Sequence, residues 1–260
     1  MMDDTTDLHA PLLRAEGYRL LSAAFGYPDV EELACLFDEA ETAARSAQQS
    51  ELASMAGRLL SAVTPDLAGE YNRLFAQAVA VSPYETSYVA ADKGVQLGRL
   101  AALMEAFGVR SRGHEHESPD HIGSELEFMA FLCLKEASHR TETSDEGQAA
   151  YESVRCVQEL FLQEHLAVWA EVFADRLKRA TRHPFYALLA EQLPAWLQQD
   201  LARNGWHCEA IVPRLHLPLL QPDGSLRSTI ETGDLDDEAM ICPMADPAAD
   251  GGESAPIPLG

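Results

Sequence analysis

The sequence predicts an all-α protein: one globular helical domain followed by a disordered acidic C-terminal tail. Apolar residues recur at helical spacing from Pro11 to Leu201, and strand-type alternation is almost absent. Hydrophobic residues make up 47% of the 260 positions, which is enough to build a core. We therefore expect a helical domain over residues 1–205, an irregular extension over 206–233 and a disordered tail over 234–260, where Ala, Pro, Gly and acidic residues dominate.

Turn and cap residues divide the first half of the domain into helices. The first is expected over about 11–25, because Gly26-Tyr27-Pro28 follows its apolar face. The second begins at Asp29 and the third at about Ser50. Thr64-Pro65 is predicted to supply the N-cap and the first-turn proline of a fourth helix.

The second half contains the helix that we expect at the centre of the fold. A preceding helix over about 95–107 is predicted to end at Gly108 in the left-handed conformation. Ser118-Pro119-Asp120 is then predicted to open a helix over 120–139 that is apolar nearly all round, and therefore buried. A long helical pattern follows the polar stretch 141–147, and His183-Pro184 starts a last helix, which Pro194 is expected to kink or divide.

The net charge of −23 bears on the possible partners. It repels phosphate backbones and anionic lipids, so it argues against nucleic-acid binding and stable membrane association, and it favours a cationic partner. The acidic N-terminus lacks the pattern of a secretory signal, and no run reaches the ~18 apolar residues needed to cross a bilayer. We therefore expect a cytoplasmic protein, for which the sequence allows a monomer or a dimer.

One polar cluster offers ligands for a metal ion. It consists of His114, His116, Glu117, Asp120, His121 and Glu125. Such a cluster is compatible with a small metal-dependent hydrolase or lyase. A polar loop that caps a buried helix explains the same residues without a metal, and no nucleotide-binding or hydrolase motif accompanies them. We therefore expect no catalytic activity, no metal and no cofactor, and we retain a structural assembly subunit of a redox complex as a further alternative.

Five sequence segments resemble motifs of the TorD/DmsD/NarJ family of redox-enzyme maturation chaperones. The central one is Glu117-Ser118-Pro119-Asp120-His121-Ile122, followed by Glu125-Leu126-Glu127-Phe128-Met129. Upstream, Glu70-Tyr71-x-x-Leu74-Phe75 and Pro83-Tyr84-Glu85-Thr86-x-Tyr88 are similar to a helix of that family and the loop after it. Downstream, Phe161-x-x-x-His165-Leu166-x-x-Trp169 fits its C-terminal half.

The resemblance implies an all-helical chaperone without catalytic activity. Such a chaperone binds the twin-arginine signal peptide, and often the apo form, of a molybdopterin oxidoreductase and holds it for cofactor insertion before export. The expected clients include nitrate, chlorate and selenate reductases and dimethylsulfide and ethylbenzene dehydrogenases. Guanidinium groups beside an apolar stretch require carboxylates beside an apolar groove. The residues expected to bind the signal peptide or client are Tyr84, Glu85, Glu117, Asp120, His121 and Glu125.

Overall fold

The structure is a computed structural model that describes residues 4–90, 92–109 and 117–208. The regular secondary structure in these ranges is helical and includes no strand, which confirms the predicted fold class. No helix in them is long and apolar enough to cross a membrane. The α-helices are α1 (Asp4–Phe25), α2 (Val30–Ser46), α3 (Ser50–Ala62), α4 (Leu67–Tyr71), α5 (Lys93–Ala106), α6 (Ile122–Arg140), α7 (Asp145–Phe161), α8 (Ala167–Ala180) and α9 (Pro184–Asn204).

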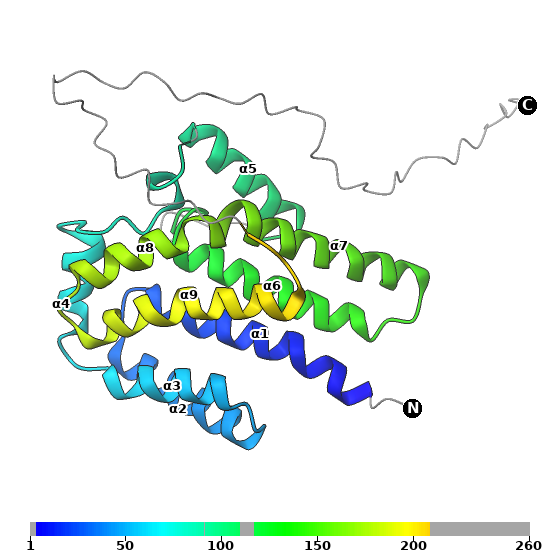
Figure 1. Ribbon diagram of the computed structural model, residues 1–260, viewed down its shortest axis with the longest axis horizontal. Coiled ribbons are helices and arrows are strands. Elements are labelled where there is room, and N and C mark those ends of the chain that lie inside the picture. The colour runs from blue at the N-terminus through cyan, green and yellow to red at the C-terminus, as the bar shows by residue number, and fades with distance from the viewer. Residues whose placement is uncertain (1–3, 91, 110–116, 209–260) are drawn as a thin grey trace, which may run out of the picture. The chain divides into compact units, whose positions relative to one another are not determined.

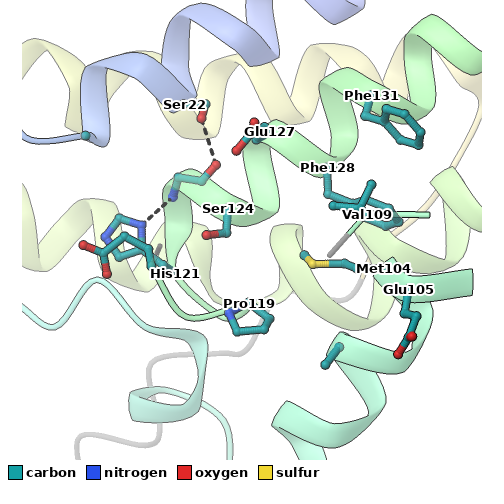
Figure 2. A pocket seen from close by; sticks show the side chains of 14 residues that line it. Ser22, Met104, Glu105, Val109, Pro119, His121, Ser124, Glu127, Phe128 and Phe131 are labelled. Carbon is teal, nitrogen blue, oxygen red and sulfur yellow. Dashed lines mark hydrogen bonds between the residues drawn. The ribbon is translucent and has the colours of Figure 1, made fainter. Parts of the chain in front are cut away.

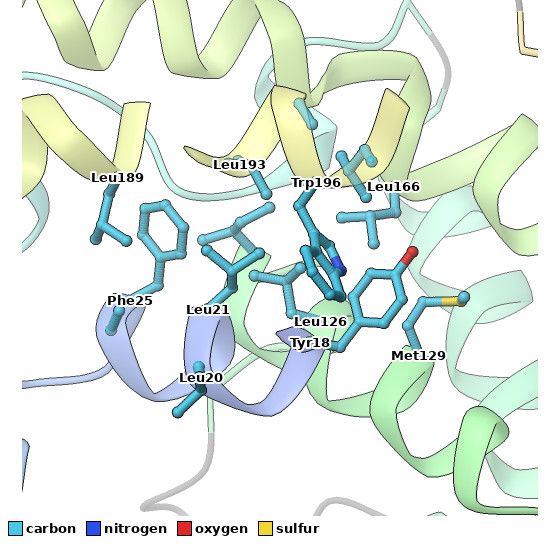
Figure 3. Close-up of a cluster of buried hydrophobic side chains, with 14 of the residues drawn as sticks. Tyr18, Leu20, Leu21, Phe25, Leu126, Met129, Leu166, Leu189, Leu193 and Trp196 are labelled. Atoms are coloured by element: carbon cyan, nitrogen blue, oxygen red, sulfur yellow. The ribbon is translucent and has the colours of Figure 1, made fainter. Parts of the chain in front are cut away.

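Helices α1, α6 and α9 form the centre of the domain, with the pair α2–α3 on one side and α7–α8 on the other (Figure 1). The core is rich in aromatic and leucine side chains, and Figure 3 shows Tyr18 and Leu21 of α1 meeting Leu126 of α6 and Trp196 of α9. Gly17 makes the close approach of α1 and α9 possible, because a Cβ atom at this position would overlap the Trp196 ring. The sequence therefore uses glycine inside a helix for packing.

A buried ionic network also ties α1 to α6 and α9. Arg14 is 4% exposed, and its Nε donates to Asp200 Oδ1 at 2.5 Å. Its Nη1 donates to Glu136 Oε2 at 2.6 Å, and Tyr18 donates to Asp200 Oδ2 at 2.7 Å. These partners compensate much of the cost of removing three charged groups from water. The network thereby fixes how the three central helices lie against one another.

Helix α5 stands apart from the central bundle (Figure 1). Only Leu100 and Met104 of its side chains are buried, and the other apolar side chains on it are partly or fully exposed. It ends at Ala106 with Phe107 as its C-cap, and Gly108 follows with a φ of 79°, as predicted for a left-handed stop. Helix α5 therefore packs on the rest of the domain through only a few apolar side chains.

Three details of the predicted helices were wrong. Helix α4 begins at Leu67, not after Thr64, because the Thr64 hydroxyl donates to Asp66 and does not cap the helix. Helix α6 begins at Ile122, since Ser118–Asp120 form a turn before it. Pro194 does not divide α9, whose buried side chains on both sides of the proline offset the lost hydrogen bond.

Residue 206, just after the predicted end of the helical domain at 205, packs against the core. Trp206 is 8% exposed, and its ring lies under the guanidinium groups of Arg14 and Arg155, whose Cζ atoms are 5.4 and 4.3 Å from its centroid. Trp206 therefore completes the core. The predicted extension over 206–233 lies outside the described residues from residue 209 onward, and the predicted tail over 234–260 lies outside them entirely.

Candidate functional site

The loop before α5 is joined to the start of α6 by backbone hydrogen bonds. Glu85 N donates to Asp120 O at 2.8 Å, and Ile122 N donates to Pro83 O at 2.9 Å. Between them, Tyr84 and His121 form an isolated antiparallel bridge. This pairing brings together two of the sequence motifs, which lie more than 30 positions apart in the chain.

Asp120 holds this junction from inside the protein. It is 1% exposed, and its Oδ2 accepts from Thr86 Oγ1 at 2.7 Å and from Thr86 N at 3.4 Å. Its Oδ1 accepts from Ser118 Oγ at 2.5 Å. The sequence interpretation made Asp120 an accessible acid in the first turn of α6, but the turn over 118–120 directs it inward. In this conformation its carboxylate has partners and lies beyond the reach of a peptide.

His121 is the N-cap of α6. Its Nδ1 accepts from Gly123 N at 3.0 Å, so the neutral ring carries its proton on Nε2. Burial lowers the pKa of His121, while the nearby charges of Glu117 and Asp120 act in the opposite direction. His121 is therefore expected to be neutral near pH 7. It lines a cavity although it is only 3% exposed, and its Nε2 has no hydrogen-bond partner among the described residues.

Glu85 and Glu125 lie in the interior, and each is 0% exposed. Glu85 contacts His165 Nδ1 at 3.1 Å and accepts from Gln96 Nε2 at 3.0 Å, while Glu125 Oε2 accepts from Trp169 Nε1 at 3.1 Å. Burial, and then the charge of Glu85, raise the pKa of Glu125 well above its ordinary value. Both residues were predicted to bind the client, but their positions give them a role in joining the Tyr84 loop to α6, α5 and the 161–169 segment.

A cavity of about 730 Å³ opens beside this junction. It lies between the end of α1, the second half of α5 and the first half of α6, and its apolar lining includes Met104, Val109, Phe128 and Phe131 (Figure 2). Three exposed carboxylates also line it: Glu105 on α5, Glu117 before α6, and Glu127 on α6. The site therefore combines apolar surface with negative charge.

Tyrosine side chains lie near Glu117, outside the lining of the cavity. Tyr84 donates to Glu117 Oε2 at 3.2 Å and packs edge-on against His121, with ring centroids 5.4 Å apart. Tyr27 is 65% exposed and packs edge-on against Tyr71 at 5.3 Å. Burial raises the pKa of Tyr71 to about 12, and the charge of Glu117 contributes to the same shift. Glu117 thus lies within electrostatic reach of several aromatic rings.

The structure brings Tyr84, Glu117 and His121 to this site. Glu85, Asp120 and Glu125 are buried and do not line the cavity. His114 and His116 lie outside the described residues, which contain no group of His, Cys, Asp or Glu side chains arranged to hold a metal. Sequence reasoning missed Glu105 and Glu127. Each is an acid within an otherwise apolar helical pattern, and that irregularity was the available signal.

Comparison with known proteins identifies the family. A family model described as nitrate reductase delta subunit matches residues 38–175, which include the motifs around Tyr84, His121 and Trp169. The chain belongs to this family. The match confirms the resemblance to the TorD/DmsD/NarJ group that the motifs indicated.

Its relatives include proteins named as chaperones. The chain is 28% identical over 139 residues to chaperone protein TorD of Vibrio cholerae, with 52% of this chain and 60% of the relative covered. It is 26% identical over 207 residues to TorD of Photobacterium profundum, with coverage of 77% and 84%. It is 37% identical over 82 residues to the chlorate reductase assembly chaperone protein of Ideonella dechloratans, with coverage of 32% and 40%. The match thus spans less than two thirds of the Vibrio cholerae and Ideonella dechloratans relatives.

Proposed function

We propose that the chain is a cytoplasmic chaperone, without catalytic activity, for a molybdopterin oxidoreductase. It binds the client's twin-arginine signal peptide, its apo form or both, and holds the client for cofactor insertion before export. The observation that carries the proposal is the apolar cavity edged by Glu105, Glu117 and Glu127. A peptide that places guanidinium groups beside an apolar stretch matches this combination.

The chemistry of the site and the names of the relatives support the same client class. The net charge of −23 attracts a basic leader over a distance, and the apolar lining can bury the stretch that follows its arginines. The Ideonella dechloratans relative is named for chlorate reductase. This name supports our proposal that the client is one of the nitrate, chlorate or selenate reductases or of the dimethylsulfide or ethylbenzene dehydrogenases.

The metal-dependent alternative gains no support from the described residues. His121 Nδ1 is occupied as the N-cap of α6, and Glu125 is enclosed beside Trp169 and Glu85. A divalent metal would have to displace these interactions.

Co-production with a client subunit tests the proposed function. We expect the full chain to co-purify with an apo oxidoreductase subunit made without its cofactor, and to release it once the cofactor is loaded. A client without its leader separates leader binding from binding of the enzyme body. The proposal fails if the chain retains neither the apo subunit nor its isolated leader, or if it retains the mature enzyme equally well.

A further inference from the structure

The candidate cavity has acidic groups at separate positions along its length. Glu117 precedes His121, whereas Glu127 lies six residues after it on α6, which is about 9 Å along a helix axis. Figure 2 shows His121 toward one end of the pocket and Glu105 at the other, with Ser124 between them. The negative charge is therefore distributed along the cavity.

The two acidic positions also have different surroundings. Glu117 adjoins Tyr84, and its charge reaches Tyr71. Glu127 is exposed, makes no hydrogen bond or ion pair with another described residue, and shares its wall with Phe131, the residue one turn later on α6. One position thus offers a carboxylate with aromatic rings, and the other offers a carboxylate beside an apolar surface.

His121 lies at the Glu117 end of the cavity and presents an unused hydrogen-bond donor. Its buried ring is held by the Gly123 N–H, and its Nε2–H has no partner within the described ranges. A backbone carbonyl of a peptide would satisfy this donor, which a neutral ring offers without repelling an arginine. The cavity therefore has a feature suited to an extended chain as well as to charged side chains.

We propose, on the basis of the proposed function, that the cavity binds two adjacent arginines of the client's leader in two subsites. One guanidinium binds Glu117 beside Tyr84, the other binds Glu127 on α6, and the peptide backbone passes His121. Neighbouring side chains of an extended peptide point in opposite directions, so two consecutive arginines separate naturally into two sites. Each planar guanidinium can donate two parallel hydrogen bonds to a carboxylate and can stack on an aromatic ring, which an ammonium group does less well.

The two-subsite arrangement also explains why a pair would be required. Each exposed carboxylate adds only modestly to the affinity for the peptide, because water competes for both the carboxylate and the guanidinium group. Two arginines on one peptide bind together, since the first contact raises the effective concentration of the second. A peptide with a single arginine occupies one subsite only and is expected to bind at least tenfold more weakly.

A crossed titration tests this assignment. Calorimetry would compare the wild-type chain, Glu117→Gln and Glu127→Gln with three leader peptides: one with both arginines, one with the first replaced by glutamine, and one with the second replaced. Glu171→Gln on α8 is a matched control, because Glu171 is also exposed and lies outside the cavity. We expect each cavity variant to lose about tenfold in affinity for the double-arginine peptide, and the control to lose none.

The pattern of coupling decides the result. Glu117→Gln should cause little further loss with one single-arginine peptide, and Glu127→Gln should cause little further loss with the other. If both variants couple to the same arginine, or if neither changes the affinity, the two-subsite assignment is overturned while leader binding stands. If the wild-type chain binds none of the peptides, both this assignment and the leader-binding part of the proposed function are overturned.

Discussion

The Thr86 hydroxyl donates a hydrogen bond to the buried carboxylate of Asp120, with Oγ1 and Oδ2 2.7 Å apart, and this contact joins the Tyr84 loop to the start of α6. The Thr86 backbone N–H lies 3.4 Å from the same oxygen. Because the loop carries Tyr84 and the α6 start carries Glu117 and His121, this contact positions one end of the candidate cavity. Asp120 therefore acts on the site through the fold.

Asp120→Asn is expected to destabilise the protein. The amide removes a charged acceptor and presents its own N–H groups to Ser118 or Thr86, so one buried hydrogen bond is weakened or lost. We expect the free energy of unfolding to fall by about 1–3 kcal/mol. Urea unfolding at pH 7 measures the change, and Asp38→Asn, at an exposed position on α2, serves as a control that should be neutral. An unchanged unfolding midpoint together with a large loss of peptide affinity would show that Asp120 contacts the client directly.

Gly17→Ala is expected to destabilise the protein, although alanine favours helices. The added methyl group would overlap the Trp196 ring, so α1 and α9 must move apart or the ring must turn. Overpacking of this kind costs about 1–3 kcal/mol, which exceeds the gain of up to ~1 kcal/mol in helix propensity.

Gly98→Ala on α5 is the matched control for Gly17→Ala. No atom lies within 4 Å of a Cβ atom at Gly98, and its φ is not in the left-handed region. This substitution should therefore stabilise α5 by about 0.5–1 kcal/mol. Thermal melts of the two variants should shift in opposite directions. A melting temperature of Gly17→Ala at or above that of the wild type would show that the contact with Trp196 is not tight.

The all-helical fold was predictable because apolar periodicity persists along the described helices. The starts of α2 at Asp29 and of α9 at His183 followed from local cap chemistry, since each side chain accepts hydrogen bonds from the first turn. The start of α6 was predicted two residues too early. Ser118-Pro119-Asp120 has the composition of a helix start, but long-range hydrogen bonds from Thr86 to Asp120 stabilise a turn instead. Such contacts are invisible in a local sequence pattern.

The candidate site was only partly predictable for the same reason. The motif around His121 marked the correct region, and Tyr84 and Glu117 do meet there. Sequence position did not reveal that Glu125 would face Trp169 while Glu127, two residues later, would face the cavity. Which carboxylates are accessible depends on how α6 is rotated against α1 and α8. That rotation is a property of the packed core.

The buried carboxyl group of Glu125 should make stability depend on pH. It faces Glu85 and Trp169, and Asp120 also adds negative charge nearby, while His165 Nδ1 contacts Glu85. Burial and the charge of Glu85 raise its pKa in the folded protein, so the folded state holds a proton that the unfolded state releases at lower pH. The stabilisation is complete below the unfolded pKa and is lost as the pH rises through the folded pKa. Over that window the contribution falls by up to ~1.4 kcal/mol per pH unit.

Glu125→Gln should remove this dependence while it preserves the contacts. The glutamine oxygen can accept from Trp169 Nε1, and its amide can donate toward Glu85, as the protonated acid does. We therefore expect the variant and the wild type to have similar free energies of unfolding near pH 5, and the variant to become the more stable one as the pH rises. Denaturant unfolding at several pH values from 5 to 9 measures the difference, with the exposed Glu171→Gln as a control that should follow the wild type throughout. A difference between Glu125→Gln and the wild type that stays constant over this range would mean that Glu125 is ionised in the folded protein, and its place in the interior would then require a positively charged partner.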